Sequence, residues 1–375
     1  ELHGVISGNG RLIKNGTHGL ELYGNNTYTG GSIIEGSVWT WHNNALGTGA
    51  VTLRNGYLAM VGHSLANDFL LEGSNYITTG ATAAAMSGDI GETAPGADVW
   101  INGAGSLTLT GQSSYSGQTR LSTRLIAAAQ DVLSDRSHYD LDLGGTLALD
   151  HDQSIGGLSG SGRVEMAGKE LDILQGPGVQ VFSGQLIGDA GSLIRKYGDG
   201  RLVLSPAAAS AYTGSFIAGG GILEIAGDYS GADALVSQGI LTGNGSIGAV
   251  SVSTGTLAGT SGQTLTMASL GMTQSSSILA SFGAPSGQTL FHVLGDVRLD
   301  GFLDIENAGG FGPGVYRLMT YDGTLDNRGL IIDRLPTGVS EDEIELQFTH
   351  DKQINVVSTT EATGPTLFWD GGDAT

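Results

Sequence analysis

Apolar and polar residues alternate in short runs along most of this chain, and turns rich in glycine, asparagine, serine and aspartate separate the runs. A period of two is typical of β-strands that present one apolar face and one solvated face. The pattern therefore predicts many short strands along the whole chain. The apolar pairs expected to face inward are Leu20/Leu22, Val51/Leu53, Val99/Ile101, Leu107/Leu109, Leu141/Leu143, Leu147/Leu149, Leu171/Ile173, Val179/Val181, Leu202/Leu204, Leu223/Ile225, Val250/Val252, Val297/Leu299, Leu303/Ile305, Ile344/Leu346 and Ile354/Val356.

One sequence phrase occurs three times: a Gly-x-Gly step, a Leu-x-Leu strand, a few turn residues and then Tyr-[Thr/Ser]-Gly. The copies begin at Ser7, Asn102 and Gly188, and their closing tyrosines are Tyr28, Tyr115 and Tyr212. Such self-similarity indicates stacked units that cannot bury their apolar faces alone. A β-sandwich would give similar strands, but the repeats and the even composition favour a parallel β-helix, in which each coil hydrogen-bonds to the next.

One stretch departs from this pattern. Residues from Arg124 to Leu133 are rich in alanine and leucine, and Ser122 and Thr123 precede them as candidate caps. These features are typical of a short helix. We expect either a turn or two of helix packed outside the β-helix or an irregular loop.

Changes in charge and in strand pattern along the sequence suggest four segments. Residues 1–238 carry the three repeat copies, and 239–290 form coils with almost no charge. Residues 291–357 are more acidic, and their longer alternating strands suggest a wider or sandwich-like coil. Residues 358–375 are expected to be a linker, from Ser358 to Gly364, followed by a further segment that begins at Trp369-Asp370-Gly371.

Composition narrows the class of protein. The 64 glycines without a Gly-X-Y period, 7 prolines and 39% hydrophobic residues describe a folded, turn-dense chain and not collagen or a disordered tract. Only 14% of residues are charged, against about 25% in typical proteins. Ser, Thr, Asn, Gln and Gly must therefore form most of the solvated surface, as in extracellular β proteins.

Charge and cysteine content exclude several functions. The net charge of −21 repels phosphate backbones and anionic lipids, so we expect no nucleic-acid partner. The absence of cysteine excludes disulfides, thiolate zinc sites and a cysteine nucleophile. No apolar run approaches the roughly 20 residues of a membrane-spanning helix, and residues 1–4 do not resemble a signal peptide.

The repeat copies resemble the autotransporter-associated β-strand repeats of Gram-negative type V secreted proteins. The resemblance covers most of residues 4 to 360 and is carried by GNGRLIKNG at Gly8, ALGTGAVTL at Ala45, the block from Leu125 to Val164 and LTGNGSIGAVSV at Leu241. It implies a right-handed β-helical passenger stalk, displayed at the cell surface or secreted. It also implies a partner, the C-terminal outer-membrane β-barrel of the same protein, through which the passenger is exported.

Two loops were weighed as protease sites. Gly188-Asp-Ala-Gly-Ser192 resembles the GDSGS loop of chymotrypsin-like autotransporter proteases, but Ala190 stands where the nucleophile would be. Gly259-Thr-Ser-Gly262 supplies only half of a subtilisin-type serine loop, and no histidine motif matches it. Both loops align with the repeat itself, so we interpret them as turns.

Acidic pairs at i and i+2 point to the same face of a strand, where they could hold calcium or act as the acid and nucleophile of a glycosidase or lyase. We interpret them as solvated outer-face acids, and no Gly-Gly-x-Gly-x-Asp calcium repeat is present. The acidic clusters are Asp140/Asp142, Asp150/Asp152, Asp304/Glu306 and Glu341/Asp342/Glu343.

The remaining candidates are histidines and tryptophans. The eight histidines lack HxxxH or HxH spacing, so we interpret them as surface or turn residues; they are His3, His18, His42, His63, His138, His151, His292 and His350. Trp39 and Trp41 lie two apart on one strand, beside His42. If they face outward, they form an aromatic strip that could stack on sugar rings or hold a partner.

The sequence thus predicts a β-helical passenger that acts as a stalk, a folding scaffold and an adhesin. We assign no catalytic, cofactor-binding or metal-binding residue. The expected external partner is a host-cell surface or matrix receptor, or a second copy of the same protein through self-association. The alternatives are a polysaccharide lyase or hydrolase on the same helix, or a toxin passenger with a receptor-binding or oligomerisation role.

Overall fold

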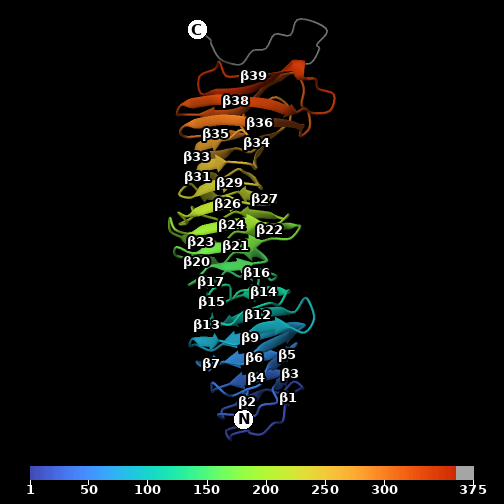
Figure 1. The fold of residues 1–375 in the computed structure, drawn as a ribbon, viewed down its shortest axis with the longest axis vertical. Coiled ribbons are helices and arrows are strands. Elements are labelled where there is room, and N and C mark those ends of the chain that lie inside the picture. Colours follow the sequence, from blue (N-terminus) through green and yellow to red (C-terminus); the bar gives the residue numbers. More distant parts are fainter. Residues whose placement is uncertain (360–375) are drawn as a thin grey trace. The chain divides into compact units, whose positions relative to one another are not determined.

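The computed structural model of the protein describes residues 1–359. The chain forms two compact units, Glu1–Leu202 and Val203–Thr375. Each unit is built from short strands that stack one coil upon the next, as the colour sequence within each unit of Figure 1 shows. β25 (Arg201–Leu204) includes the boundary between the units.

Unit 1 consists of stacks of parallel strands, in which each coil adds one strand to a stack. The first stack is β1 (Leu12–Lys14), β3 (Ser32–Ile34), β5 (Val51–Arg54), β8 (Phe69–Glu72) and β11 (Ile90–Glu92). The second is β7 (Ser64–Leu65), β10 (Ala84–Met86), β13 (Ser106–Leu109), β15 (Arg124–Ala127), β17 (Thr146–Leu149), β20 (Arg163–Met166) and β23 (Gln185–Gly188).

The third stack of unit 1 carries the candidate site. It comprises β2 (Leu20–Leu22), β4 (Ser37–Thr40), β6 (Tyr57–Met60), β9 (Ser74–Thr79), β12 (Asp98–Gly103), β14 (Gln118–Leu121), β16 (His138–Leu141), β19 (Gly157–Gly160) and β22 (Val179–Phe182). A shorter stack contains β18 (Gln153–Ile155), β21 (Glu170–Leu174) and β24 (Leu193–Tyr197).

Unit 2 repeats this architecture with longer strands. Its parallel stacks contain β26 (Ser215–Ala218), β27 (Ile222–Ile225), β28 (Asp228–Tyr229), β29 (Asp233–Val236), β30 (Ile240–Gly243), β31 (Ser246–Val252), β32 (Thr256–Thr260), β33 (Leu265–Met272), β34 (Ser277–Phe282), β35 (Phe291–Val293), β36 (Val297–Asn307), β37 (Gly314–Tyr321) and β38 (Leu325–Arg334). The last strand, β40 (Gln353–Ser358), runs antiparallel to β37 and to β39 (Ile344–Gln347).

The predicted fold class, a parallel β-helix, is therefore confirmed. Inward positions of successive coils align, so that Leu107 on β13 pairs with Ala84 on β10 and Leu125 on β15, and all three are buried. The right-handedness implied by the resemblance stays a prediction, and so do the divisions after residues 238, 290 and 357.

The closing tyrosine of each repeat copy points into the core. Tyr28, Tyr115 and Tyr212 are each at most 2% exposed. Tyr28 Oη bonds Ser32 Oγ and Tyr115 Oη bonds Thr119 Oγ1, both at 2.7 Å, while Tyr212 Oη donates to a backbone carbonyl at 2.8 Å. The Tyr-[Thr/Ser]-Gly signature is thus a buried anchor whose hydroxyl is satisfied by the start of the following strand.

A buried lysine marks two of the three copies, and sequence analysis missed it. Lys14 Nζ donates to the carbonyls of Asn15 and Gly16 at 2.8 Å, and Lys196 Nζ donates to those of Tyr197 and Gly198 at 2.9 Å. Lys14 is 8% exposed and Lys196 is 0% exposed. The middle copy has Ile101 at the equivalent position, also buried.

Close coil-to-coil packing explains part of the high glycine content. Three glycines, Gly145, Gly162 and Gly184, stack in successive coils. The backbone N–H of Arg163 donates to the carbonyl of Gly145, and that of Gln185 donates to the carbonyl of Gly162, both at 2.9 Å. A Cβ on Gly162 would lie 2.4 Å from Gly145 O, and one on Gly184 would lie 2.1 Å from Gly162 O. No side chain fits there unless the coils separate.

We expect Gly162→Ala to lower the free energy of unfolding by about 1 to 3 kcal/mol, the usual cost of overpacking. Gly176→Ala is the matched control, because its Cβ would meet no atom within 4 Å and its backbone is not left-handed. The control should be neutral or slightly stabilising. Urea unfolding monitored by circular dichroism compares the two; equal effects would contradict the packing explanation.

The helix considered for residues 124–133 is wrong. Arg124–Ala127 form strand β15, paired with β13 and β17, and a turn follows. Leu125 and Ala127 face the core, whereas Arg124 and Ile126 face outward, so the period of two overrides the helix propensity of alanine and leucine. The single helical element of residues 1–359 is the 3-10 turn η1 (Glu341–Glu343).

Two of the predicted inward pairs are also wrong. Leu143 is 85% exposed, because it lies at the tip of a turn closed by the bond from Gly145 N to Asp142 O. Val179 and Val181 are 65% and 46% exposed, because β22 turns Phe182 to the core. A shift of one residue exchanges the two faces of a strand.

Ser358 is the last residue of β40 and is buried, so the linker predicted from Ser358 begins inside a strand. Residues 360–364 and the Trp369-Asp370-Gly371 motif lie outside the described residues. Within residues 1–359, the structure contains no helix with the length and apolar character needed to cross a membrane.

Candidate functional site

A row of aromatic rings crosses four coils on the outer face of the third stack of unit 1. Trp39, Tyr57, Tyr76 and Trp100 follow one another on β4, β6, β9 and β12, with ring centroids 5.8, 6.4 and 5.4 Å apart. Strand pairing aligns Tyr57 with Tyr76 and Tyr76 with Trp100. Residues that alternate with them on the same strands are buried in the core, so the rings must face outward.

A second row lies beside the first, at the end nearest β2. The ring of His3 stacks on that of Tyr23 at 4.4 Å, and Tyr23 stacks on Trp41 at 5.3 Å with 7° between the ring planes. Trp39 and Trp41 belong to the same coil and therefore join the two rows. We call these seven rings, of His3, Tyr23, Trp39, Trp41, Tyr57, Tyr76 and Trp100, the aromatic face.

The aromatic face is built into the fold. A Cβ at Gly19 would lie 2.1 Å from the indole of Trp39, so glycine there makes room for the ring. At the other end, the guanidinium of Arg120 lies 4.6 Å from the centroid of the Trp100 ring, a cation–π contact. Stacked pairs of this kind contribute about 0.5 to 1.5 kcal/mol each. The rings therefore stabilise neighbouring coils.

Part of the aromatic face remains open to solvent. Trp41 is 42% exposed and Tyr76 is 37% exposed. Within residues 1–359, the indole nitrogens of Trp39 and Trp41 and the hydroxyls of Tyr57 and Tyr76 make no hydrogen bond to the protein. Trp100 differs, because its Nε1 donates to Ser122 Oγ at 2.9 Å.

Polar residues continue the same outer face beyond Trp100. Arg120 pairs with Asp142 through Nη2 at 2.9 Å and through Nε at 3.1 Å. The hydrogen bond from Arg120, together with one from Ser122, lowers the pKa of Asp142. Asp142, from the predicted pair Asp140/Asp142, is thus a partner of Arg120 and not a free carboxylate.

His138, Ser159 and Asp140 lie together on β16 and β19, but their hydrogen bonds do not form a catalytic relay. His138 Nε2 lies 2.7 Å from Ser159 Oγ, and Ser159 Oγ donates to Asp140 Oδ1 at 3.0 Å. In a Ser-His-Asp triad the carboxylate would instead accept from His Nδ1. Here His138 Nδ1 is buried without a partner, and burial lowers the pKa of the ring.

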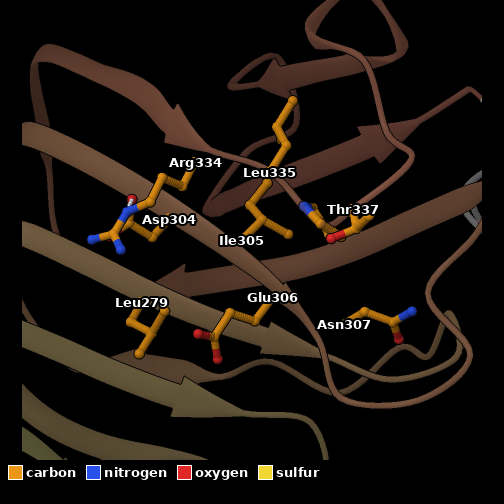
Figure 2. Close-up of a pocket in the computed structure, with 9 residues that line it drawn as sticks. Leu279, Asp304, Ile305, Glu306, Asn307, Arg334, Leu335 and Thr337 are labelled. Carbon is orange, nitrogen blue, oxygen red and sulfur yellow. Dashed lines mark hydrogen bonds and ion pairs between the residues drawn. The ribbon is translucent and has the colours of Figure 1, made fainter.

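Unit 2 contains an open cleft of about 460 Å³ between β36 and the segment after β38, lined by Leu279, Asp304, Ile305, Glu306, Asn307, Arg334, Leu335, Pro336 and Thr337. Both oxygens of Asp304 accept hydrogen bonds from Arg334, at 3.2 and 2.9 Å, as Figure 2 shows. The Asp304 side chain is 10% exposed. Glu306, which accepts from Ser281 Oγ at 3.0 Å, is exposed.

This arrangement constrains the chemistry of the cleft. Asp304 is held by a cation through both of its oxygens, so neither is free to attack a substrate or to donate a proton. Breaking such a pair would leave a buried carboxylate unpaired, which is costly. Asp304 and Glu306, the predicted pair, therefore line the same cleft, but they are not two equivalent, free carboxylates.

The other candidates occupy turns. Asp152 accepts from Glu170 N at 2.9 Å, and Glu343 caps η1 by accepting from Ser340 N at 2.8 Å. Ser192 Oγ bonds the backbone at Asp189 and Gly168, and Ser261 Oγ accepts from Gly283 N. Their hydroxyls and carboxylates close turns between coils. In the part of the chain that the structure describes, no three His, Asp or Glu side chains gather to hold a metal ion.

Sequence analysis identified two members of the aromatic face, Trp39 and Trp41, and their outward orientation is observed. It did not place His3, Tyr23, Tyr57, Tyr76 or Trp100 on this face. The spacing of about one coil between Tyr57, Tyr76 and Trp100 was a signal, but coil lengths vary, so only the strand register shows that these three rings align.

Comparison with known proteins places the repeats in a family. The passenger-associated-transport-repeat model matches residues 12–36, 102–123 and 194–225, which overlap the three copies and contain their closing tyrosines. An autotransporter named adhesin BmaC, from Brucella suis biovar 1 (strain 1330), is 42% identical over 85 residues, which are 22% of this chain and 2% of that relative. The chain thus spans a small fraction of the relative's length. No solved structure matches the chain.

Proposed function

We propose that this chain, a segment of an autotransporter passenger and so a cell-surface or secreted protein of a Gram-negative bacterium, acts as a stalk and folding scaffold and presents an adhesive outer face. The passenger's expected partner in export is the outer-membrane β-barrel of its own protein. We further propose that the segment has no enzymatic activity.

The observation that carries the scaffold role is the parallel pairing of each coil with the next, which is in continuous register along the first two stacks of unit 1. The strands of a finished coil expose backbone N–H and C=O groups that only the next coil satisfies. Each coil can therefore form on the one before it, as in other solenoids whose repeats contact only their neighbours. The buried tyrosine of each copy, with its satisfied hydroxyl, fixes the coil that carries it.

This role predicts that removing a repeat copy lowers secretion. Residues 106–123 form one whole coil, because Arg124 takes the register position of Ser106, and they include Tyr115. Residues 146–162 form another coil, because Arg163 takes the position of Thr146, and they lie outside the matched repeats. We expect deletion of residues 106–123 to lower the secreted yield several-fold, and deletion of 146–162 to have a smaller effect.

The measurement is the amount of passenger outside the cell, by immunoblot, with both deletions made in the full-length protein. Wild-type yield after deletion of residues 106–123 would contradict the scaffold role. Equal losses of secreted yield from both deletions would show that every coil contributes alike to secretion and that the repeat copy has no particular role.

Support for the adhesive role comes from the relative, which is named an adhesin, and from the aromatic face, whose rings lie open on the outside of unit 1. The test is attachment of bacteria that display the passenger to host cells, compared with bacteria that lack it. Receptor binding and self-association are the two forms of adhesion expected.

An enzyme is the second candidate, because the cleft of unit 2 contains two carboxylates. Its test is release of oligosaccharide from acidic glycans, with and without calcium. Turnover that Glu306→Gln abolishes would replace the scaffold as the principal function. We expect none, since Arg334 occupies both oxygens of Asp304.

A further inference from the structure

The aromatic face has properties that coil packing does not require. Of the residues that the structure describes, all three tryptophans lie on it. An interior position would bury such rings fully, yet here the indole of Trp41 and the ring of Tyr76 remain about two-fifths exposed. Apolar surface gathered on one outer face of a soluble protein usually marks a contact with another molecule.

The polar tips of the rings point to the kind of molecule. The indole N–H groups of Trp39 and Trp41 and the hydroxyls of Tyr57 and Tyr76 have no partner within residues 1–359. A ligand that fits must therefore offer apolar C–H surface to the rings and hydrogen-bonding groups to their tips. Sugar rings combine an apolar face of C–H groups with hydroxyls around the rim.

The charges near the aromatic face narrow the class of ligand further. Arg120, whose guanidinium lies over the Trp100 ring, is paired with Asp142, and Glu21 accepts a hydrogen bond from Tyr23 at the other end of the face. With a net charge of −21 on the chain, an acidic polymer would be repelled. Because Arg120 and Glu21 are already bonded within the protein, this face matches a neutral ligand better than a charged one.

Geometry supports a linear ligand. The rings of Tyr57, Tyr76 and Trp100 recur once per coil at aligned register positions of neighbouring strands, and the ring of Trp39 continues the row 5.8 Å from that of Tyr57. A chain of sugar rings can extend along such a row, whereas a folded partner would need a hollow to fill.

We infer that the aromatic face of unit 1 binds a neutral polysaccharide, with sugar rings against Trp41 and Tyr76 and sugar hydroxyls bonded to the free tips. This inference rests on the proposed adhesive function and names the ligand class of that face.

The experiment uses the whole chain in affinity electrophoresis and tryptophan-fluorescence titration. Neutral probes are dextran, galactomannan and mixed-linkage β-glucan; acidic probes are alginate and heparin. We expect at least one neutral probe to bind, with little dependence on salt. Trp41→Ala and Tyr76→Ala should each weaken binding roughly ten-fold. Tyr76→Phe, which keeps the ring, should weaken it less.

Phe302→Ala is the matched control, because Phe302 is an exposed aromatic residue of unit 2, 37% exposed like Tyr76. It should bind as the wild type does. Thermal melting confirms that each variant is folded; if Trp41→Ala is not, Tyr76→Phe and Trp41→Phe carry the test. Failure of all three neutral probes, binding of acidic probes alone, or wild-type affinity in Tyr76→Ala would overturn the inference.

Sedimentation of the free chain addresses self-association: dimers abolished by Trp41→Ala would assign the face to a second copy and overturn the inference. The outcomes for the two proposals are separable. If displaying bacteria attach to host cells equally well with Trp41→Ala and Tyr76→Ala, the adhesive function stands and this inference fails. If the chain binds neutral polysaccharide but the bacteria do not attach, the inference stands and the adhesive function fails.

Discussion

An aspartate in place of Leu109 is expected to unfold the coils around it, whereas an aspartate in place of Thr108 is expected to leave them intact. Leu109 is 3% exposed on β13 and pairs with Met86 and Ala127, which are both fully buried. Thr108 is its neighbour on the same strand but faces outward. Losing a buried leucine costs about 2 to 5 kcal/mol, and an unpaired buried carboxylate adds several more. That sum is comparable with the whole stability of a typical domain, about 5 to 15 kcal/mol.

Limited proteolysis followed by mass spectrometry measures this effect. We expect Leu109→Asp to be cut in the coils on either side of β13, and Thr108→Asp to resist the protease as the wild type does. Leu109→Met, which keeps volume and apolarity, should cost less than about 1.5 kcal/mol and remain protected. Equal protection of the two aspartate variants would mean that Leu109 does not face the core.

The comparison of Leu109 with Leu143 shows how far the sequence alone could predict the fold. Both stand in Leu-x-Leu pairs, and both were expected inside. The period of two identified the strand correctly in each case, but a strand's end depends on where a turn begins. The hydrogen bond from Gly145 N to Asp142 O closes a turn, so strand β16 ends before Leu143. Nothing in the local pattern of apolar residues marks the end of the strand.

The stretch from Arg124 shows the opposite limit. Local composition favoured a helix, but a strand at this position can bond to β13 on one side and β17 on the other. Those ladder hydrogen bonds, and the burial of Leu125 and Ala127, outweigh a propensity difference of a few tenths of a kcal/mol per residue. Helix propensity is a weak guide inside a solenoid.

Only part of the aromatic face could be predicted from the sequence, because most of its rings meet through contacts between coils. Trp39 and Trp41 share a face because they are two apart on one strand, which the sequence states directly. Tyr57, Tyr76 and Trp100 join them only through the register between coils, and coils of unequal length hide that register. The same holds for the pair of Asp304 and Arg334, which are far apart in sequence and meet across β36 and β38.

The buried lysine of the third repeat copy leads to a prediction about pH. Burial lowers the pKa of Lys196 from 10.5 to about 8, although Asp199 acts in the opposite direction. The unfolded chain therefore binds the proton more tightly than the folded chain does. Between pH 8 and about 10.5 the unfolded state holds more protons, so the stability of unit 1 should rise with pH in that window.

Below about pH 8 the lysine is charged in both states, and its burial cost is present in full. We expect Lys196→Met to remove that cost, as Ile101 does in the middle copy, and so to stabilise the protein near pH 7 by on the order of 2 kcal/mol after allowing for solvent screening near the turn. The variant loses two hydrogen bonds to carbonyls, which offsets part of the gain.

Urea unfolding of the wild type and of Lys196→Met at several pH values from about 7 to 9.5 makes the measurement. The difference in stability between them should shrink as the pH rises, because the wild-type lysine becomes neutral. Burial raises the pKa of Tyr115 and Tyr139, but both proteins contain these tyrosines, so their ionisation cancels in the difference. A difference that stays constant with pH would show that Lys196 keeps its charge in the folded protein, held by the carbonyls of Tyr197 and Gly198.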